Sequence, residues 1–307
     1  MSPAESVKSK AAGLGFDICG IAKYRRLSEG IQRLDEWCLS GMNAKMGYLC
    51  RDIDKRMDPE FLLPGVKSVI VTGLSYYSEK GQRKPGVPVI SRYAYGRSYQ
   101  DVIKQKLTVL ADHICNLLPG AAWKIYSDTG PVAEKRWAVE AGLGWQGRHS
   151  IVINREIGSF FFIGVILLDR ELDYDAPVEG NHCGNCRKCI EACPTSAIND
   201  NFTIDARKCI SNLTIEDRDP VEQEFISKLG GRIYACDRCQ EVCPWNSGIK
   251  EHTHPEFAIS DELADMDRHD WEELSAEKFR KLFKGTPVGR MKYDKFRTNL
   301  DNILKHG

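Results

Sequence analysis

Apolar and polar positions along residues 1–170 predict helices and strands that follow one another in turn. Residues 4–14 have helical spacing, and the next apolar stretch, "FDICGIA" at 16–22, is typical of a strand. Residues 66–77 are dense in β-branched side chains, which indicates a buried strand. The segment 98–118 predicts a helix with one apolar face, formed by Val102, Ile103, Leu107, Leu110, Ile114 and Leu117.

A strand, a helix and two more strands complete this part of the chain. The strand "AAWKIYS" ends at residue 127, and we expect the next helix to have Thr129 as N-cap, Pro131 near its first turn and Gly142 as its stop. Two strands follow at 150–154 and 159–169. The run "FFFIGVILL" in the last of them is about half as long as a membrane span, so it predicts a buried strand.

The order of these elements predicts an α+β (or α/β) fold with a central sheet. Residues 171–182 are polar and include Pro177 and Gly180, which indicates a domain boundary. Beyond about residue 255 the chain is helical in pattern and charged, and residues 278–305 contain nine Lys or Arg against two Asp. We therefore expect a sheet-containing domain, a cysteine-rich domain and a short helical C-terminal segment, at 1–175, 176–250 and 251–307.

Charge and the N-terminal sequence exclude two broad classes of protein. The 307 residues include 43 Lys or Arg and 43 Asp or Glu, so the chain is not a basic polymer, and any nucleic-acid contact has to come from a local patch. The N-terminus "MSPAESVKSKAAGLGF" has neither the apolar core of a signal peptide nor a twin arginine. The pattern predicts a cytoplasmic protein with no membrane segment.

Twelve cysteines are an unusual number for a cytoplasmic chain. Thiols stay reduced in that compartment, so clustered cysteines there indicate metal ligands or catalysts rather than disulfides. Eight of the twelve are clustered between residues 183 and 243. A free cysteine among apolar neighbours behaves as a small hydrophobic residue. This is our expectation for the four scattered ones, Cys19, Cys38, Cys50 and Cys115.

The clustered cysteines form two related motifs. The first is C-x2-C-x2-C-x3-C-P, ending at Pro194, and the second is one cysteine followed, after 26 residues, by C-x2-C-x3-C-P, ending at Pro244. In two-cluster ferredoxins the cysteine before the proline ligates the other cluster. The spacing therefore predicts two [4Fe–4S] clusters, one on Cys183, Cys186, Cys189 and Cys243 and the other on Cys193, Cys209, Cys236 and Cys239. Structural zinc, which favours separated C-x2-C pairs, is the alternative.

One carboxylate stands out among the residues before the cysteine motifs. Asp128 lies between a predicted strand and a predicted helix, where a helix N-terminus stabilises an anion or a reacting group. The alternative is that Asp128 simply caps the helix. The glycine-rich "GLGWQG" at 142–147 is equally consistent with a phosphate loop and with a tight turn. The sequence has no P-loop, no G-x-G-x-x-G after a strand and no H-E-x-x-H.

Five blocks of this sequence resemble the epoxyqueuosine reductase family, in the same order and at similar spacing. They are "SRYAYGRSYQDVIK", "DTGPVAEKRWAVEAGLGWQGRHS", "CGNCRKCIEACPTSAI", "KCISNLTIE" and "CDRCQEVCPWN". The resemblance implies reduction of epoxyqueuosine to queuosine at the wobble position of tRNA with a GUN anticodon. It also implies two cofactors, cobalamin and a pair of [4Fe–4S] clusters. We further expect a low-potential electron donor and a monomeric enzyme.

The resemblance also implies roles for single residues. Asp128 matches the general acid that protonates the departing epoxide oxygen. A set that again includes Asp128 matches cofactor-binding positions near the corrin or the substrate: Arg56, Asp128, Val152, Ile163, Ser211 and Arg218. The family's cobalamin has no protein imidazole below cobalt, which agrees with the absence of a D-x-H-x-x-G motif from this sequence.

Two features depart from the family pattern. The family often has G-x-D-Y-H where this chain has "GRSYQ" at Gly96–Gln100, so the Asp and His of that motif are missing. Many members continue into a C-terminal helical-repeat domain, whereas this sequence ends at Gly307 as a short form. We therefore expect tRNA to bind the catalytic core and the basic segment 278–305. An equal alternative for that segment is a solvated amphipathic helix whose aromatic residues face the core, namely Phe279, Phe283, Tyr293 and Phe296.

Two other functions are alternatives to a tRNA-modifying reductase. One is a cobalamin-dependent reductive dehalogenase, a class typically exported with the twin-arginine signal that this N-terminus lacks. The other is a plain iron–sulfur electron-transfer protein. That function requires only the cysteine-rich part of the chain and leaves the residues before it, including Asp128, without a role.

Overall fold

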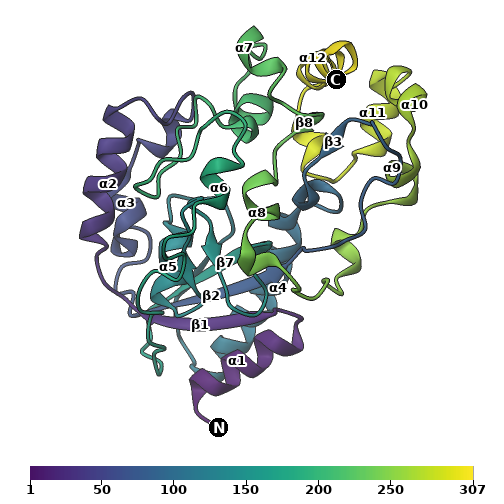
Figure 1. Ribbon diagram of the computed structural model, residues 1–307. Helices are drawn as coiled ribbons and strands as arrows, with labels where there is room; N and C mark the ends of the chain where they lie inside the picture. The colour runs from purple at the N-terminus through teal and green to yellow at the C-terminus, as the bar shows by residue number, and fades with distance from the viewer. Residues whose placement is uncertain (307) are drawn as a thin grey trace.

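A four-stranded antiparallel sheet forms the centre of the N-terminal part of the computed structural model, which describes residues 1–306 (Figure 1). The strand order is β1-β2-β7-β4, and all neighbouring pairs are antiparallel. The strands are β1 (Ile18–Lys23), β2 (Ser68–Ser75), β4 (Trp123–Tyr126) and β7 (Phe161–Leu168). Each coincides with a segment that the sequence pattern predicts as a strand, except that β1 extends one residue further, to Lys23, and the mixed fold class is confirmed.

Helices cover both faces of this sheet. On one face α1 and α4 pack against Ile166 and Leu168, and on the other face α2, α3 and α5 share a core with Val165 and Leu167. Alternate residues of β7 thus enter different cores. Burial on both faces explains why this strand has a continuous apolar sequence. The helices are α1 (Pro3–Gly13), α2 (Ser28–Leu39), α3 (Ile53–Met57), α4 (Tyr99–Leu117) and α5 (Glu134–Glu140).

The sequence pattern locates α4 correctly but misplaces the start of α5. In α4 the predicted apolar face is buried except at Leu117, which is 37% exposed at the helix end. The prediction that Thr129 caps the next helix is wrong. α5 begins only at Glu134, and its N-cap, Ala133, has no side chain that can accept a hydrogen bond. Gly142, with φ +73°, follows the last turn of α5 and ends it as predicted.

A second core joins the C-terminal helices to parts of the chain far away in sequence. β3 pairs in parallel with β8, and both contribute to a core with the helices α9 to α12 (Figure 1). Phe279, Phe283 and Phe296 are fully buried in it, as the core-facing alternative predicts. The elements are β3 (Val89–Ile90), β8 (Arg232–Tyr234), α9 (Asp261–Asp265), α10 (Arg268–Glu272), α11 (Ala276–Leu282) and α12 (Tyr293–His306).

Short elements lie between these two cores and carry the cysteine motifs. α6 packs against α8, and each is one turn inside a motif. A small hairpin with a bridge between Ile198 and Ile204 connects the two motifs. The remaining elements are β5 (Trp145–Gln146), β6 (Val152–Ile153), α6 (Lys188–Glu191), a π-helical turn (Asn212–Glu216), α7 (Gln223–Ile226) and α8 (Arg238–Glu241).

The expectation that all four scattered cysteines are free is wrong for two of them. Cys38 and Cys50 form a disulfide. The chain leaves α2 after Leu39 and returns through a short 3-10 turn at Gly47–Leu49, which brings the two Cα atoms to 5.8 Å. That separation is within the usual range for a disulfide. Cys19 and Cys115 are free, and burial raises the pKa of Cys19 to about 12, so this thiol is protonated and unreactive.

The disulfide closes a loop, residues 38–50, which belongs to the sheet-containing part of the chain and contacts the cysteine-rich part. The backbone carbonyl of Met42 accepts a hydrogen bond from the Ala206 N–H at 2.8 Å. Lys45 forms ion pairs with Asp217, at 3.6 Å, and with Asp219. Just before the loop, the Trp37 indole donates to the Ile204 carbonyl at 2.7 Å. We call residues 38–50 the clasp.

None of the helices within the described residues is long and apolar enough to cross a membrane. The apolar run in β7 is a buried strand of the sheet, as predicted.

Replacing both clasp cysteines, Cys38→Ser with Cys50→Ser, should destabilise the protein by about 3 kcal/mol, because it removes a cross-link that restricts the unfolded chain. The measurement is the thermal midpoint of the cluster-loaded protein under anaerobic conditions. A thiol reductant should lower the midpoint of the wild type and leave that of the double variant unchanged. Alkylation of the denatured, unreduced wild type should leave Cys38 and Cys50 unlabelled, and labelling at both would contradict the disulfide.

Candidate active site

A cavity of about 1480 Å³ lies between the sheet, the clasp and the cysteine-rich segment. This volume exceeds the range of about 300–1,000 Å³ that holds most drug-sized ligands. Aromatic and aliphatic side chains form much of its wall, among them Tyr76, Tyr93, Phe162 and Phe202. Clasp residues Met46, Tyr48 and Leu49 also line it. The site therefore suits a large ligand with apolar faces.

Asp128 presents its carboxylate to this cavity from the loop between β4 and α5. The Tyr99 hydroxyl donates a hydrogen bond to Asp128 Oδ2 at 2.5 Å, and the Gln100 amide lies 3.5 Å from the same atom. Tyr99 is itself held by stacking on Phe162, with ring centroids 4.3 Å apart. Because this carboxylate faces Tyr99 and not the N-terminus of α5, the alternative role as a helix cap does not hold.

The backbone of Asp128 is held in a conformation that non-glycine residues rarely adopt. Its φ is +55°, in the left-handed region, and its N–H donates to Glu134 Oε1 at 2.6 Å. The Glu134 carboxyl thus holds the backbone N–H of Asp128 and so orients that residue. Gly130 in the same loop packs on Tyr126 so closely that a Cβ there would lie 2.4 Å from the ring. These contacts fix the direction of the Asp128 side chain.

Burial in the cavity wall shifts the pKa of three titratable groups near Asp128. Burial, with the charge of Asp128, raises the pKa of Glu134 to about 8. Burial lowers the pKa of Lys135, although the charges of Asp128 and Glu134 oppose it. Burial also lowers the pKa of His149 to about 4, so its imidazole is neutral at pH 7. Burial around Asp128 therefore disfavours the charged form of all three groups, and only the carboxyl of Glu134 keeps its acidic proton in the neutral form.

The structure brings most of the other predicted cofactor-binding residues to the same cavity. Arg56, Val152, Ile163 and Ser211 all line it. Arg56 also donates to the Tyr48 carbonyl at 2.9 Å, which connects it to the clasp. Arg218 is exposed further along the segment that carries Ser211, outside the cavity wall as the described residues form it.

Several residues that line the cavity have a buried polar atom without a hydrogen-bond partner among the described residues. These atoms include Arg56 Nε, Arg136 Nε, His149 Nε2 and both side-chain atoms of Asn212. Buried polar atoms are normally paired, so a group of unpaired ones around one cavity indicates a polar ligand. His149 and Asn212 are not among the site residues that the sequence predicts. Asn212 lies inside the quoted block "KCISNLTIE", but only its position and lack of partners in the fold distinguish it.

The charges of the eight clustered cysteines act on one another within two sets, although no group of three or more His, Cys, Asp or Glu among the described residues has the geometry of a metal-ion site. Burial and the thiolates of Cys243, Cys183 and Cys186 raise the pKa of Cys189 to about 11. Burial, and among other charges that of Cys209, raises the pKa of Cys236 to about 11. Cys209 and Cys236 also repel the thiolate of Cys239, and Cys193 repels that of Cys209. Such repulsion among buried thiolates is relieved by a cationic metal centre.

Only one of these two groups faces the cavity. Within the described residues, Cys193, Cys209, Cys236 and Cys239 belong to its wall, whereas Cys183, Cys186, Cys189 and Cys243 do not. The two groups adjoin, because Cys189 also affects the pKa of Cys239. The first cysteine group thus adjoins the second, and the second adjoins the space in front of Asp128.

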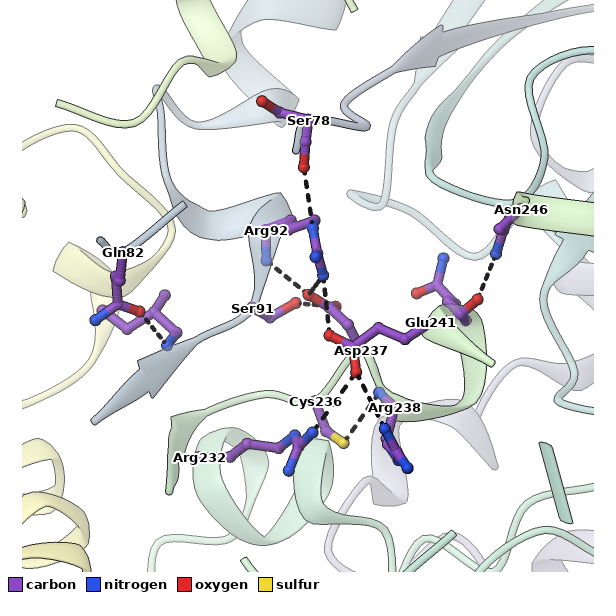
Figure 2. A network of polar contacts seen from close by, with 12 residues as sticks. Ser78, Gln82, Ser91, Arg92, Arg232, Cys236, Asp237, Arg238, Glu241 and Asn246 are labelled. Carbon is purple, nitrogen blue, oxygen red and sulfur yellow. Dashed lines mark hydrogen bonds and ion pairs between the residues drawn. The ribbon is translucent and has the colours of Figure 1, made fainter. Parts of the chain in front are cut away.

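A polar network holds the second motif in place (Figure 2). The buried Asp237 follows Cys236 and accepts hydrogen bonds from the Ser91 hydroxyl and, at 2.8 Å, from the Arg92 N–H. The Arg92 guanidinium also pairs with Glu241 at 3.0 Å (Figure 2). Ser91 follows β3 directly, so the network fixes the cysteine turn to the second core.

Replacing Glu134 by glutamine should make stability less dependent on pH. A carboxyl whose pKa is 4.5 when unfolded and about 8 when folded stabilises the protein fully below pH 4.5, and this contribution is lost as pH rises towards 8. Glutamine keeps the acceptor for the Asp128 N–H but cannot ionise beside Asp128, Lys135 and Arg56. The thermal midpoint of Glu134→Gln minus that of wild type should therefore grow by at least about 2 °C between pH 5 and 8.5.

Glu140 provides the matched control on the same helix, because it pairs with Arg25 and Arg136, both at 2.9 Å. Glu140→Gln should lower the thermal midpoint at neutral pH, a change opposite in direction to that expected for Glu134→Gln. A pH-independent difference between wild type and Glu134→Gln would show that Glu134 ionises normally in the folded protein.

Comparisons with known proteins agree with this architecture. Residues 182–246 match the family model of the 4Fe-4S double cluster binding domain, and residues 56–129 match that of "Epoxyqueuosine reductase QueG, DUF1730". An epoxyqueuosine reductase of Cellulophaga algicola is 42% identical over 96% of both chains. These matches place the cysteine groups in a double-cluster domain, and they place Arg56 and Asp128 in the reductase-specific part.

Solved structures give the same result. A crystal structure of an epoxyqueuosine reductase with an epoxyqueuosine-modified tRNA-Tyr stem loop has a TM-score of 0.90 and 28% identity, over 98% of this chain and 80% of that one. The enzyme from Bacillus subtilis, solved with its aspartate-bearing catalytic loop swung out of the active site, has a TM-score of 0.89 and 28% identity, over 98% and 81%. With 42% identity to a curated relative over nearly its whole length, the chain belongs to the epoxyqueuosine reductase family of oxidoreductases.

Proposed function

We propose that this protein reduces epoxyqueuosine to queuosine at the wobble position of tRNA with a GUN anticodon, as a monomer, with Asp128 as the general acid. The observation that carries the proposal is the position of Asp128. Its carboxylate faces a large cavity whose wall includes the second cysteine group. Proton delivery and electron delivery therefore meet in one space. The relative solved with its modified tRNA stem loop supports the substrate.

The proposed reaction needs two electrons and two protons. Both C–O bonds of the epoxide break, a C=C bond forms between the two carbons, and the oxygen leaves as water. Asp128 supplies a proton to that oxygen, and Tyr99 donates the hydrogen bond that orients the acid. Glu134 holds the backbone of the acid in place. The catalytic aspartate loop of the Bacillus subtilis relative supports this role for the loop between β4 and α5.

The proposed ligands of the two [4Fe–4S] clusters are the two cysteine groups. Cys183, Cys186, Cys189 and Cys243 hold the outer cluster, and Cys193, Cys209, Cys236 and Cys239 hold the one at the cavity. The match to the double-cluster domain supports this arrangement. A low-potential donor then delivers electrons to the outer cluster, because the inner one borders the space where the substrate reacts.

The residues around the cavity fit cobalamin as the second cofactor. The wall offers the volume, the apolar faces and the unpaired polar atoms that a corrin with its amide side chains requires. Arg56, Val152, Ile163 and Ser211 would hold it. Bound there, cobalamin supplies a reduced cobalt as the one-electron reaction centre. Arg218 stays a prediction from the family resemblance, since it lies outside the cavity wall.

Basic side chains near the site are the proposed contacts for the tRNA backbone. The turn between α11 and α12 lies beside Tyr99, because the Gly285 carbonyl accepts the Ser98 N–H at 2.7 Å and Arg290 donates to the Ser98 hydroxyl at 2.9 Å. Lys281 and Lys284 are exposed and have no ion pair with any described residue. Lys278, by contrast, pairs with Asp270 at 3.3 Å.

The direct test is to incubate the reduced protein anaerobically with cobalamin and tRNA that contains epoxyqueuosine, then to digest the tRNA and analyse the nucleosides. Queuosine is the expected product. Absence of queuosine from protein with verified clusters and bound cobalamin would overturn the proposed function.

Asp128→Asn should lower kcat by at least about 100-fold, because general acid catalysis contributes that much to the rate. Clusters and cobalamin should remain bound, as absorbance spectra would confirm. The control is Asp101→Asn, which removes the same charge from an exposed position on α4 and should leave turnover unchanged. Wild-type turnover in Asp128→Asn would assign Asp128 a structural role only.

Replacing Lys281 and Lys284 together by glutamine should weaken tRNA binding and reduce the slope of log affinity against log salt by about 1 to 2. Each lost phosphate contact changes this slope by roughly 0.7–0.9. Lys278→Gln should have the smaller effect, since Lys278 is already paired with Asp270. The measurement is a tRNA titration at several salt concentrations, and an unchanged slope would exclude this surface.

A further inference from the structure

Asn212 has a buried side-chain amide for which the described part of the chain supplies no partner. The residue is 4% exposed, and neither Oδ1 nor Nδ2 makes a hydrogen bond. Asn212 is one of the residues that line the cavity. A buried amide that is left unpaired is costly, and such groups are rare in folded proteins.

The backbone around Asn212 is unusual as well. Asn212 opens a π-helical turn that runs to Glu216, and its carbonyl accepts the Asp217 N–H at 2.9 Å. π-Helical turns are rare and occur frequently at functional sites. The turn satisfies the backbone of Asn212 and leaves its side chain free. Its neighbours are Cys209, which accepts a backbone hydrogen bond from Asn212, and Ser211.

His149, which lines the same cavity, is a second buried residue with an unpaired polar atom. His149 is 3% exposed, and its Nε2 has no partner within the described residues. The Ile151 N–H donates to His149 Nδ1 at 3.3 Å, so the ring proton of the neutral imidazole is on Nε2. His149 also lines the cavity, so a second lining residue carries an unpaired donor.

Asn299 shows what a buried asparagine with a structural role is like in this protein. It is fully buried, and its Nδ2 donates to the carbonyls of Thr214, at 2.9 Å, and of Ile233, at 3.1 Å. It ties the π-helical turn to β8 and lies in the second core, away from the cavity wall. Oδ1 of Asn299 has no partner among the described residues, but its Nδ2 makes two hydrogen bonds, whereas neither side-chain atom of Asn212 makes any.

We propose that the carboxamide of Asn212 is a recognition group for an amide edge of a ligand, which presents a hydrogen-bond acceptor beside a donor. Asn212 can pair with both through its own donor and acceptor, as asparagine does in bidentate recognition of base edges. Naming the ligand rests on the proposed function. Two molecules in that reaction carry such an edge: cobalamin, in its carboxamide side chains, and the modified 7-deazaguanine base, in its lactam.

The test uses Asn212→Leu, which has nearly the same shape as asparagine and no polar atoms. Three quantities are compared with wild type in cluster-loaded protein: the thermal midpoint without cobalamin, the Kd for cobalamin from absorbance, and the KM for epoxyqueuosine-containing tRNA. The midpoint should rise by roughly 2–4 °C, because an unpaired buried amide is removed. At least one ligand should bind about 10-fold more weakly, which corresponds to the loss of one bidentate contact.

The pattern of the losses identifies the ligand. A weaker Kd for cobalamin with an unchanged KM for tRNA assigns the amide edge to the corrinoid, and the reverse assigns it to the base. Asn299→Leu is the matched control and should lower the midpoint while leaving both ligands unaffected. Asn212→Ala repeats the binding measurements with a smaller side chain, should leucine not be accommodated.

Unchanged affinity for both ligands in Asn212→Leu and Asn212→Ala would overturn the proposal, whatever the thermal midpoint does. Failure of this proposal can be distinguished from failure of the proposed function. A wild-type protein that forms no queuosine contradicts the function, whereas a weaker Kd for cobalamin in Asn212→Leu would still support the role of Asn212.

Discussion

The last cysteine of each motif lies with the cysteines of the other motif, and the rest of the structure depends on this constraint. Cys193 ends the first motif but groups with the second, and Cys243 ends the second but groups with the first. Neither group is complete until both motifs have met. The 26-residue insertion between Cys209 and Cys236 is therefore tied at both ends, and it has to form the π-helical turn and β8 within that span. One wall of the cavity results directly from this closure.

Two sets of contacts attach this wall to the remainder of the protein. On one side Asp237 is bonded to Ser91 and Arg92, which anchors the second motif to the core of the C-terminal helices. On the other side the clasp contacts Ala206, Asp217 and Asp219. The opposite wall belongs to the sheet and to α5, where Glu134 holds the Asp128 peptide. The space in front of Asp128 is thus bounded by parts of the chain that share no local sequence.

Features that follow from local physical rules were predictable from the sequence. Alternate burial makes β7 apolar throughout, and a 3.6-residue period places Ile103, Leu107 and Leu110 on one face of α4. Cysteine spacing predicts two ligand sets, because in two-cluster ferredoxins the cysteine before the proline ligates the other cluster, and this assignment stays a prediction. The strand-to-helix junction already distinguished Asp128, whereas Arg56 and Ser211 were reached only through resemblance to a family.

Features that depend on contacts between distant segments were not predictable. Thr129 has the chemistry of an N-cap, but the left-handed backbone at Asp128 and the anchor at Glu134 delay the helix by several residues. Cys38 and Cys50 pair because of how the chain turns after α2, which no composition rule describes. Asn212 differs from Asn299 only in what surrounds it, so the two are equivalent in the sequence.

The disulfide of the clasp bears on how the protein matures. Its two cysteines are 12 residues apart, and both precede every cysteine of the cluster motifs in the chain. Because synthesis proceeds from the N-terminus, Cys38 and Cys50 leave the ribosome before any of the eight thiols that must stay reduced for metal. The pairing of Cys38 with Cys50 thus closes one short N-terminal loop and uses none of the eight thiols that gather farther along the chain.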